Sequence, residues 1–202
     1  MIDLPKNFMA LDLELNNAED NSTPNPKIIQ VGIAIGNITQ EPKDYFRAKW
    51  FINPHEPIFS FITKLTGITD KNVQDESVTH QQVAEELAEI MEAKQVFSHV
   101  ITWGNDDLSA LLKEFKENHI EFKYYRNQFI DISSLNIFLL LSKGKKSFGG
   151  LRSTMSEFKL KFEGEQHRAD VDAFNTLVLF FEMIKRQKQL EDILTIAKDV
   201  KR

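Results

Sequence analysis

Carboxylates dominate the side chains of this chain that could carry out chemistry, and the first pair stands in the segment FMALDLEL (8–15). Asp12 and Glu14 are two positions apart, so in a strand they leave the same face with backbones roughly 6 to 7 Å apart. Two acids held that close inside a protein raise each other's pKa unless a cation neutralises them, which predicts a divalent metal ion. For an isolated D-x-E pattern, an edge strand with its acids in water is the alternative. Phe8 and Ala10 share the acid face and favour a covered position.

A second group of acids opens the predicted helix in ITWGNDDLSALLKEF (101–115). Helical phase separates Asp106 from Asp107, because Asp107 lies one turn before Leu111 on the apolar side. We therefore expect Asp107 to point inward and Asp106 to point outward. The alternative is that one or both aspartates cap the helix N-terminus. The apolar stripe that sets this phase consists of Leu108, Leu111, Leu112 and Phe115.

The third group is HRADVDAFNT (167–176), where His167 precedes Asp170 and Asp172. A histidine titrates near neutrality and can act as a general base, so acids beside it suggest catalysis. For this segment alone, a surface histidine and a capping Asp170 is the alternative. Helical phase does not choose between the two aspartates, because the helix that follows is apolar almost all round. No comparable acidic neighbours flank the other histidines in the sequence, which are His55, His80, His99 and His119.

The elements that must position these groups alternate between strand and helix patterns. Alternating or continuous apolar residues predict a three-stranded meander followed by two further strands, at 8–15, 28–35, 47–54, 95–102 and 125–132. Apolar residues at helical spacing predict helices at 58–67, 80–93, 106–119, 133–142, 147–160 and 169–187. The order indicates an α/β fold with a mixed five-stranded sheet flanked by helices. We expect one domain over 1–202, with a core at 7–186 and a C-terminal helix at 189–202.

The amino-acid composition excludes several kinds of site and of protein. The chain has 202 residues, 42% of them hydrophobic, and no cysteine, so disulfides and thiolate zinc sites are excluded. Its net charge of −5 argues against a protein that coats polyanions through dense basic residues. This net charge is compatible with an enzyme that binds phosphate groups through metal ions. The N-terminus has no signal pattern and no stretch is long and apolar enough to span a membrane, which predicts a soluble, cytoplasmic protein.

Taken in order, the three acidic groups resemble the His-containing branch of the DEDD 3′-to-5′ exonuclease superfamily (DEDDh). That branch includes polymerase proofreading subunits, oligoribonucleases and exoribonucleases that trim RNAs. The pattern is D-x-E on a first strand, an aspartate opening a helix after a central strand, and H-x-A-x-x-D near the C-terminus. The resemblance runs from Phe8 to about Ile184, and KLTGITD (64–70) and FINP (51–54) look like connecting segments of that family.

This resemblance implies a ribonuclease-H-like fold in which the acids converge on two divalent cations, Mg²⁺ or Mn²⁺. Asp12, Glu14 and Asp172 would bind metal directly, Asp107 would bind largely through water, and His167 would be the general base. The family spacing places the third acid five positions after the histidine, which selects Asp172 and leaves Asp170 as a helix cap. Two metal ions suit phosphodiester hydrolysis because they activate the attacking water and stabilise the leaving oxygen.

The resemblance also places the backbone of Leu15 and Asn16 against the terminal nucleotide. Many members have small hydroxyl residues after the glutamate, where this chain has Leu15-Asn16-Asn17. Many proofreading members have asparagine at the position of Trp103, and W-G-x-x-D looks more like the RNA-trimming enzymes. This favours RNA, although Trp103 could equally be a core aromatic at a strand end.

The sequence thus predicts a metal-dependent 3′-5′ exonuclease that releases nucleoside 5′-monophosphates from single-stranded ends, RNA slightly favoured over DNA. One alternative is an inactive module that binds nucleic acid or a protein, and another is a ribonuclease-H-like endonuclease. Lys143, Lys145 and Lys146 form a basic loop that could touch phosphates, although a solvated loop is the commoner outcome.

Overall fold

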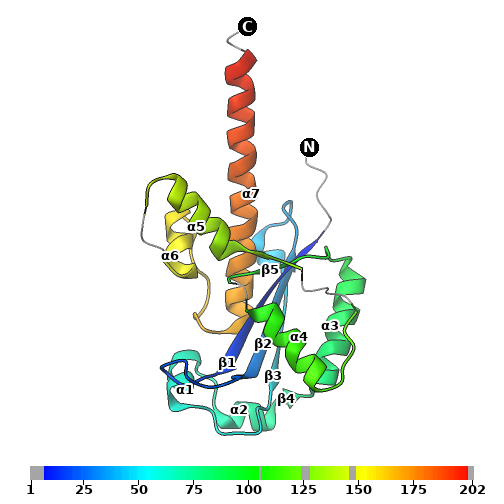
Figure 1. Cartoon of the computed structure of the whole chain (residues 1–202). Coiled ribbons are helices and arrows are strands. Elements are labelled where there is room, and N and C mark those ends of the chain that lie inside the picture. Colours follow the sequence, from blue (N-terminus) through cyan, green and yellow to red (C-terminus); the bar gives the residue numbers. More distant parts are fainter. Residues whose placement is uncertain (1–6, 105, 124–127, 146–148, 200–202) are drawn as a thin grey trace.

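A six-stranded mixed sheet forms the centre of the molecule (Figure 1). The computed structural model describes residues 7–104, 106–123, 128–145 and 149–199, with side chains up to 193. The strand order is β4-β3-β2-β1-β5-β6, with β1 antiparallel to β2 and parallel to β5. The strands are β1 (Phe8–Asn16), β2 (Lys27–Gly36), β3 (Phe46–Ile52), β4 (Ser77–Val78), β5 (Val100–Thr102) and β6 (Phe129–Asp131).

The predicted mixed α/β fold is confirmed, but the predicted strand number of five is wrong. The sixth strand is β4, which pairs only two residues in parallel with the end of β3. A segment this short carries no period of its own, so the sequence pattern did not reveal it. Strand β5 is shorter than the expected 95–102, because the chain bends at residues 98–99 before the strand begins. Of the strand expected at 125–132, residues 125–127 lie outside the described part of the chain.

Most helices begin and end close to the predicted bounds, but α6 covers only 151–157 of the expected 147–160, of which 147–148 lie outside the described residues. Two other differences concern α2 and α7. The short helix α2 has no counterpart in the sequence prediction, and α7 runs unbroken through the region where a separate C-terminal helix was expected. Helix α1 stops at Gly67, whose φ of 70° is the left-handed conformation that glycine adopts most easily. The bounds are α1 (Ser60–Thr66), α2 (Asp70–Asp75), α3 (His80–Lys94), α4 (Asp107–Glu117), α5 (Ile132–Ser142), α6 (Leu151–Glu157) and α7 (Ala169–Asp199), with a 3₁₀ turn at Pro42–Asp44.

Alternation along β1 divides the interior into two main cores. Met9, Leu11 and Leu13 pack against the buried faces of α3 and α4. Phe8 and Ala10 point to the other side of the sheet and pack against residues of α5, α6 and α7. Because strand side chains alternate, Asp12 and Glu14 share the face of Phe8 and Ala10, which is the α7 side. A third, smaller cluster lies under α1 and α2.

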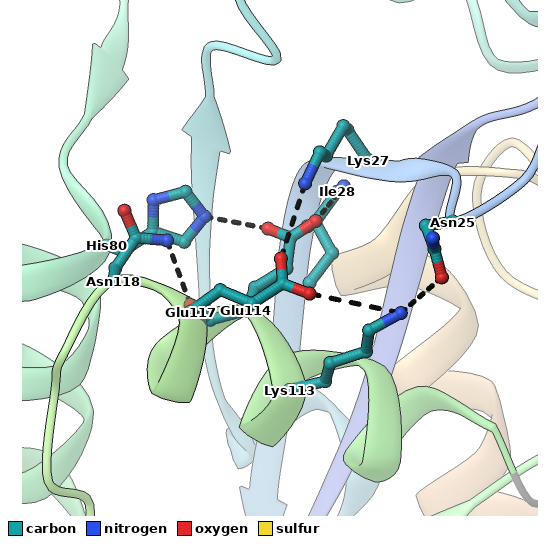
Figure 2. A network of polar contacts seen from close by, with 8 residues as sticks. All are labelled: Asn25, Lys27, Ile28, His80, Lys113, Glu114, Glu117 and Asn118. Atoms are coloured by element: carbon teal, nitrogen blue, oxygen red, sulfur yellow. Dashed lines mark hydrogen bonds and ion pairs between the residues drawn. The ribbon is translucent and has the colours of Figure 1, made fainter.

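On the opposite side of the sheet, a buried carboxylate ties α4 to the start of β2 (Figure 2). Glu114 is 6% exposed, and its Oε1 accepts the backbone N–H of Ile28 at 2.9 Å. Its Oε2 lies 2.7 Å from Nε2 of His80, the first residue of α3. The β1–β2 register shifts between Glu14 and Leu15, so that Leu15 faces Ile28. Glu114 therefore satisfies a backbone donor next to an irregularity in the sheet.

Helix α7 is the longest element and extends well past the sheet toward the C-terminus (Figure 1). Its first half supplies much of the second core, from Ala173 to Phe181. Farther along, Leu190 and Ile193 are exposed. Within the described part of the chain, no helix combines the length and the apolar character needed to cross a membrane.

Candidate active site

The acid pair of β1 lies in the middle of the sheet, under the start of α7. Asp12 is half-buried and Glu14 is 8% exposed. Their cross-strand partners on β2 are Gly32 and Gln30 respectively. The covered position that Phe8 and Ala10 indicated is thus the observed one, and the alternative of an edge strand with its acids in water is wrong.

The turn that leads into α7 brings His167 and Asp172 over the same place. His167 has a φ of 64°, a left-handed backbone that reverses the chain just before the helix. Its N–H donates to Oδ2 of Asp172 at 2.9 Å, which fixes the aspartate in the first turn. Candidate metal-binding atoms of Glu14, His167 and Asp172 all lie within 4.8 Å of one another. Glu14 thus forms one site with His167 and Asp172, although more than 150 positions separate it from them in the chain.

Asp107 reaches the site from the end of β5. It is the first residue of α4 and is half-buried, whereas Asp106 is exposed and makes no capping hydrogen bond with its side chain. The phase argument for the two aspartates is therefore confirmed. The turn before α4 is held by Gly104, whose N–H donates to Oδ1 of Asp131 at 3.0 Å. Gly104 has a φ of 116°, a conformation that suits glycine.

The four acids repel one another. Burial, together with the charges of Asp107, Glu14 and Asp172, raises the pKa of Asp12 well above its ordinary value. Burial, Asp172 and Asp107 raise the pKa of Glu14 to about 8, although Arg168 opposes the shift. These electrostatic effects place all four acids within reach of one another's charge.

The other pKa values shift in the same direction. Burial, with the charges of Asp106 and Asp131, raises the pKa of Asp107 to about 7. Burial also raises the pKa of Asp172, against the lowering effect of the His167 N–H bond. Near neutral pH the site therefore holds protons unless a cation replaces them.

The donor set fits hard divalent cations. Carboxylate oxygens are the ligands that Mg²⁺ and Mn²⁺ prefer, and a nearby imidazole nitrogen is compatible with Mn²⁺. Oδ1 of Asp172 is buried and has no hydrogen-bond partner among the described residues. A buried carboxylate oxygen without a donor requires compensation, which a metal ion would supply.

Sequence comparison agrees with this geometry. Residues 9–180 match the sequence model of the exonuclease family (RNase_T). The chain belongs to this family. It is an exonuclease domain.

Relatives of this exonuclease domain include two proteins of Bacillus subtilis. It is 27% identical over 187 residues to the 3′-5′ exonuclease DinG, covering 91% of this chain but only 18% of DinG. It is 27% identical over 190 residues to the probable 3′-5′ exonuclease KapD, covering 90% of this chain and 86% of KapD. The chain thus matches nearly all of one relative and a small part of the other.

Among solved structures, the nuclease domain of 3′hExo, a DEDDh family member bound to rAMP, shares the fold. The TM-score is 0.75 at 20% identity, over 91% of this chain and 94% of that one. At this identity the likeness establishes the ribonuclease-H-like fold and nothing finer.

Asp170 has a different role from the helix cap that was expected. Helix α7 of the exonuclease begins at Ala169, so Asp170 lies inside the first turn. Its Oδ2 accepts a hydrogen bond from Arg47 of β3 at 3.0 Å, and its Oδ1 is 3.9 Å from Nζ of Lys49. Asp170 therefore faces β3, whereas Asp172 lies beside Glu14. The prediction of a cap overlooked a basic partner 123 residues away.

Two residues that the resemblance placed against the terminal nucleotide have structural contacts of their own. Asn16 is fully buried, and its amide bonds to Glu56, to the Pro57 carbonyl and to the Phe59 N–H. Leu15 packs against the core on the α3 and α4 side. Only their backbone remains available for a nucleotide, and that part of the prediction stays a prediction.

Two further sequence features have structural explanations. Trp103 is half-buried and packs against the second core, as the alternative interpretation of that residue held. Lys145 pairs with Glu157 at 3.1 Å, and Lys146 lies outside the described residues.

The sequence interpretation missed three residues that the fold uses. His80, which has no acidic neighbour in the sequence, bonds to Glu114 from 34 positions away, as Figure 2 shows. Gln30 and Gly32 interrupt the apolar run of β2 and contact the start of α7. A signal for the last two was present, because a glycine inside a strand marks a close approach of another backbone.

Proposed function

We propose that the protein is a metal-dependent 3′-5′ exonuclease acting on single-stranded nucleic acid, with RNA slightly favoured over DNA and nucleoside 5′-monophosphates as products. The observation that carries this proposal is that candidate metal-binding atoms of Glu14, His167 and Asp172 lie within 4.8 Å of one another. The carboxylates of Asp12 and Asp107 are close enough to add their negative charge to this group. Mg²⁺ or Mn²⁺ is the proposed cofactor, and the cytoplasm is the proposed location.

In this mechanism the acids hold the cations and the histidine moves the proton. Asp12, Glu14 and Asp172 would bind metal directly, with Asp107 at the edge of the site. When bound, two divalent ions lower the pKa of an attacking water and stabilise the departing oxygen. His167 lies beside Glu14 and Asp172, and its backbone N–H donates to Asp172. Its ring would take the proton of the water and later return it to the 3′ oxygen.

Support for RNA comes from the W-G-x-x-D pattern and from the bound rAMP of the 3′hExo nuclease domain. The packing of Trp103 against the core weakens the first argument, because its side chain has a structural reason to be there. RNA is therefore favoured only slightly, and the choice between RNA and DNA is made part of the test.

The test is a gel time course on matched 5′-labelled RNA and DNA oligonucleotides with Mg²⁺. We expect a ladder that shortens from the 3′ end, faster on RNA, and no reaction in EDTA. The variant Asp12→Ala should lose the ladder while keeping the far-ultraviolet circular dichroism of the wild type. A single internal cut, or an unchanged rate on a 3′-blocked oligonucleotide, would indicate an endonuclease instead.

The same preparation separates the enzyme from a module that binds without cleaving. Calorimetric titration with Mn²⁺ should show binding by the wild type that Asp12→Ala weakens. Absence of both Mn²⁺ binding at millimolar concentration and cleavage would favour the binding module and contradict the proposal.

A further inference from the structure

Gln30 is a polar side chain in the most buried part of the sheet. It lies on β2 within the sequence IIQVGIAI, and none of its surface is exposed. Its Oε1 accepts the backbone N–H of Ala169 at 2.9 Å. Ala169 is the first residue of α7, where backbone N–H groups have no partner within the helix. Gln30 thus satisfies the N-terminus of α7 from a neighbouring strand.

The same part of β2 is in direct contact with the α7 backbone. A Cβ atom placed on Gly32 would lie 2.0 Å from the carbonyl carbon of Ala169 and 2.1 Å from the nitrogen of Asp170. Real Cβ atoms do not approach backbone that closely, so only glycine allows this contact. The first turn of α7 therefore rests on the β2 surface between Gln30 and Gly32.

These contacts lie next to the acids. Gln30 is the cross-strand partner of Glu14, and Gly32 is the partner of Asp12. The helix turn that they hold carries Asp172, and it follows His167 directly. One hydrogen bond, from Ala169 to Gln30, thus links the strand beside Glu14 to the turn that carries the other half of the site.

The orientation of the Gln30 amide follows from this bond. Because the Ala169 N–H is a donor, the amide oxygen must face it. The amide nitrogen is then directed elsewhere, and it is buried without a hydrogen-bond partner among the described residues. A buried donor left without a partner is costly, so a merely structural role is a poor explanation for glutamine at this position.

We propose that Gln30 is a positioning residue of the active site. Its side-chain oxygen, bound to the Ala169 N–H, sets the separation of His167 and Asp172 from Glu14. The expected effect of Gln30 on metal affinity and on catalysis rests on the proposed function, whereas its expected effect on the first turn of α7 does not. When a residue that positions a metal ligand without itself binding the metal is lost, metal affinity or activity typically falls roughly ten- to a hundredfold.

Three variants test this proposal. Gln30→Met keeps the length and volume of the side chain but removes the strong acceptor. Gln30→Glu keeps an acceptor for the Ala169 N–H but adds a buried carboxylate beside Glu14, so it tests the bond to Ala169 and not metal binding. Gln81→Met is the matched control, because Gln81 is an exposed residue of α3 whose side chain bonds to Glu85. If Gln30→Met does not fold, Gln30→Asn carries the same expectations, since its shorter side chain fails to reach Ala169.

The first measurement is independent of cleavage. We expect the amide hydrogen of Ala169 to exchange faster in Gln30→Met, and to keep its protection in Gln30→Glu and Gln81→Met. We also expect Mn²⁺ affinity, measured by calorimetry, to fall roughly ten- to a hundredfold in Gln30→Met and to stay at the wild-type value in Gln81→Met. A variant that only destabilised the fold would unfold at lower temperature and leave Mn²⁺ affinity unchanged.

The second measurement is the kinetics of oligonucleotide shortening at saturating Mg²⁺. Gln30→Met should lower kcat and leave KM for the oligonucleotide close to the wild-type value. The proposal is overturned if Gln30→Met keeps wild-type Mn²⁺ affinity and kcat, or if the Ala169 amide hydrogen exchanges no faster in Gln30→Met than in the wild type. If the wild type cleaves no oligonucleotide, the proposed function fails, while Ala169 exchange and Mn²⁺ affinity still decide the role of Gln30.

Discussion

Two buried groups of carboxylate and histidine lie on opposite faces of the same sheet, and they differ in how their atoms are satisfied. On the α4 side, both oxygens of Glu114 have partners, the Ile28 N–H and the His80 ring (Figure 2). On the α7 side, one oxygen of Asp172 has no partner among the described residues. The acids around it repel one another and have raised pKa values.

This difference separates a structural site from a functional one. A buried acid that is fully hydrogen-bonded stabilises its surroundings and has no need of a further ligand. Several acids brought together without donors destabilise the fold, and such an arrangement is retained where a cation or a reaction uses it. The two groups have similar residue types and similar burial. What distinguishes them is whether every carboxylate oxygen has a hydrogen-bond partner.

The largest effect should distinguish Asp172 from Asp170. Asp172→Asn removes a proposed metal ligand, and metal ions supply several kcal/mol of transition-state stabilisation, so activity should fall about a thousandfold. Asp170→Asn weakens a partly exposed contact with Arg47 and should change activity by no more than about threefold. Rates of oligonucleotide shortening measure both, and equal losses in the two variants would contradict the assignment.

Loss of the histidine should be the next largest effect. His167→Gln removes the proposed general base and should lower kcat by about a hundred- to a thousandfold. Mn²⁺ binding measured by calorimetry should persist, because the carboxylates remain. His80→Gln is the matched change on the other face, and it should leave kcat within about twofold while lowering the melting temperature. A large loss of kcat in His80→Gln would remove the contrast between the two groups.

A smaller effect, on stability, should have opposite signs on the two faces. Glu114→Leu leaves the Ile28 N–H without its acceptor and should destabilise the protein by about 1 to 3 kcal/mol. For a chain of this size that corresponds to roughly 2 to 4 °C of melting temperature per kcal/mol. Glu14→Gln relieves repulsion, so it should raise the melting temperature of the metal-free protein at pH 9 while abolishing activity. Calorimetry of both variants in EDTA is the test, and two shifts of the same sign would refute it.

A further effect on stability is a slope with pH. The pKa of Glu14 rises from 4.5 to about 8 on folding, and that of Asp107 from 3.8 to about 7. The folded state then retains protons that the unfolded state has released. The unfolding free energy of the metal-free protein should therefore fall as pH rises through this window, from about 4 to about 8. Thermal unfolding in EDTA measures the slope, which Glu14→Gln or saturating Mg²⁺ should flatten. If the unfolding free energy of the wild type does not change with pH, the fold does not raise the pKa values of these acids.

The fold class and most site residues were predictable because their signals are local. The D-x-E on an apolar strand and the inward phase of Asp107 can each be recognised within a short segment, whereas the choice of Asp172 over Asp170 came from the resemblance to the family. Strand β4 was missed because two residues have no period. The ion pair of Asp170 with Arg47, and the bond of His80 to Glu114, join distant segments and have no local signature.

By itself the sequence determined which groups are available for chemistry, and the alternation of β1 determined which face the first two acids occupy. The tertiary structure alone decided which carboxylates remain unsatisfied and which are held by a donor. It also decided that α7 begins in contact with β2, where Gly32 leaves room and Gln30 accepts the first N–H of the helix. The reason is physical: periodicity fixes the direction of a side chain relative to its own element, whereas hydrogen-bond satisfaction depends on atoms that arrive from other parts of the chain.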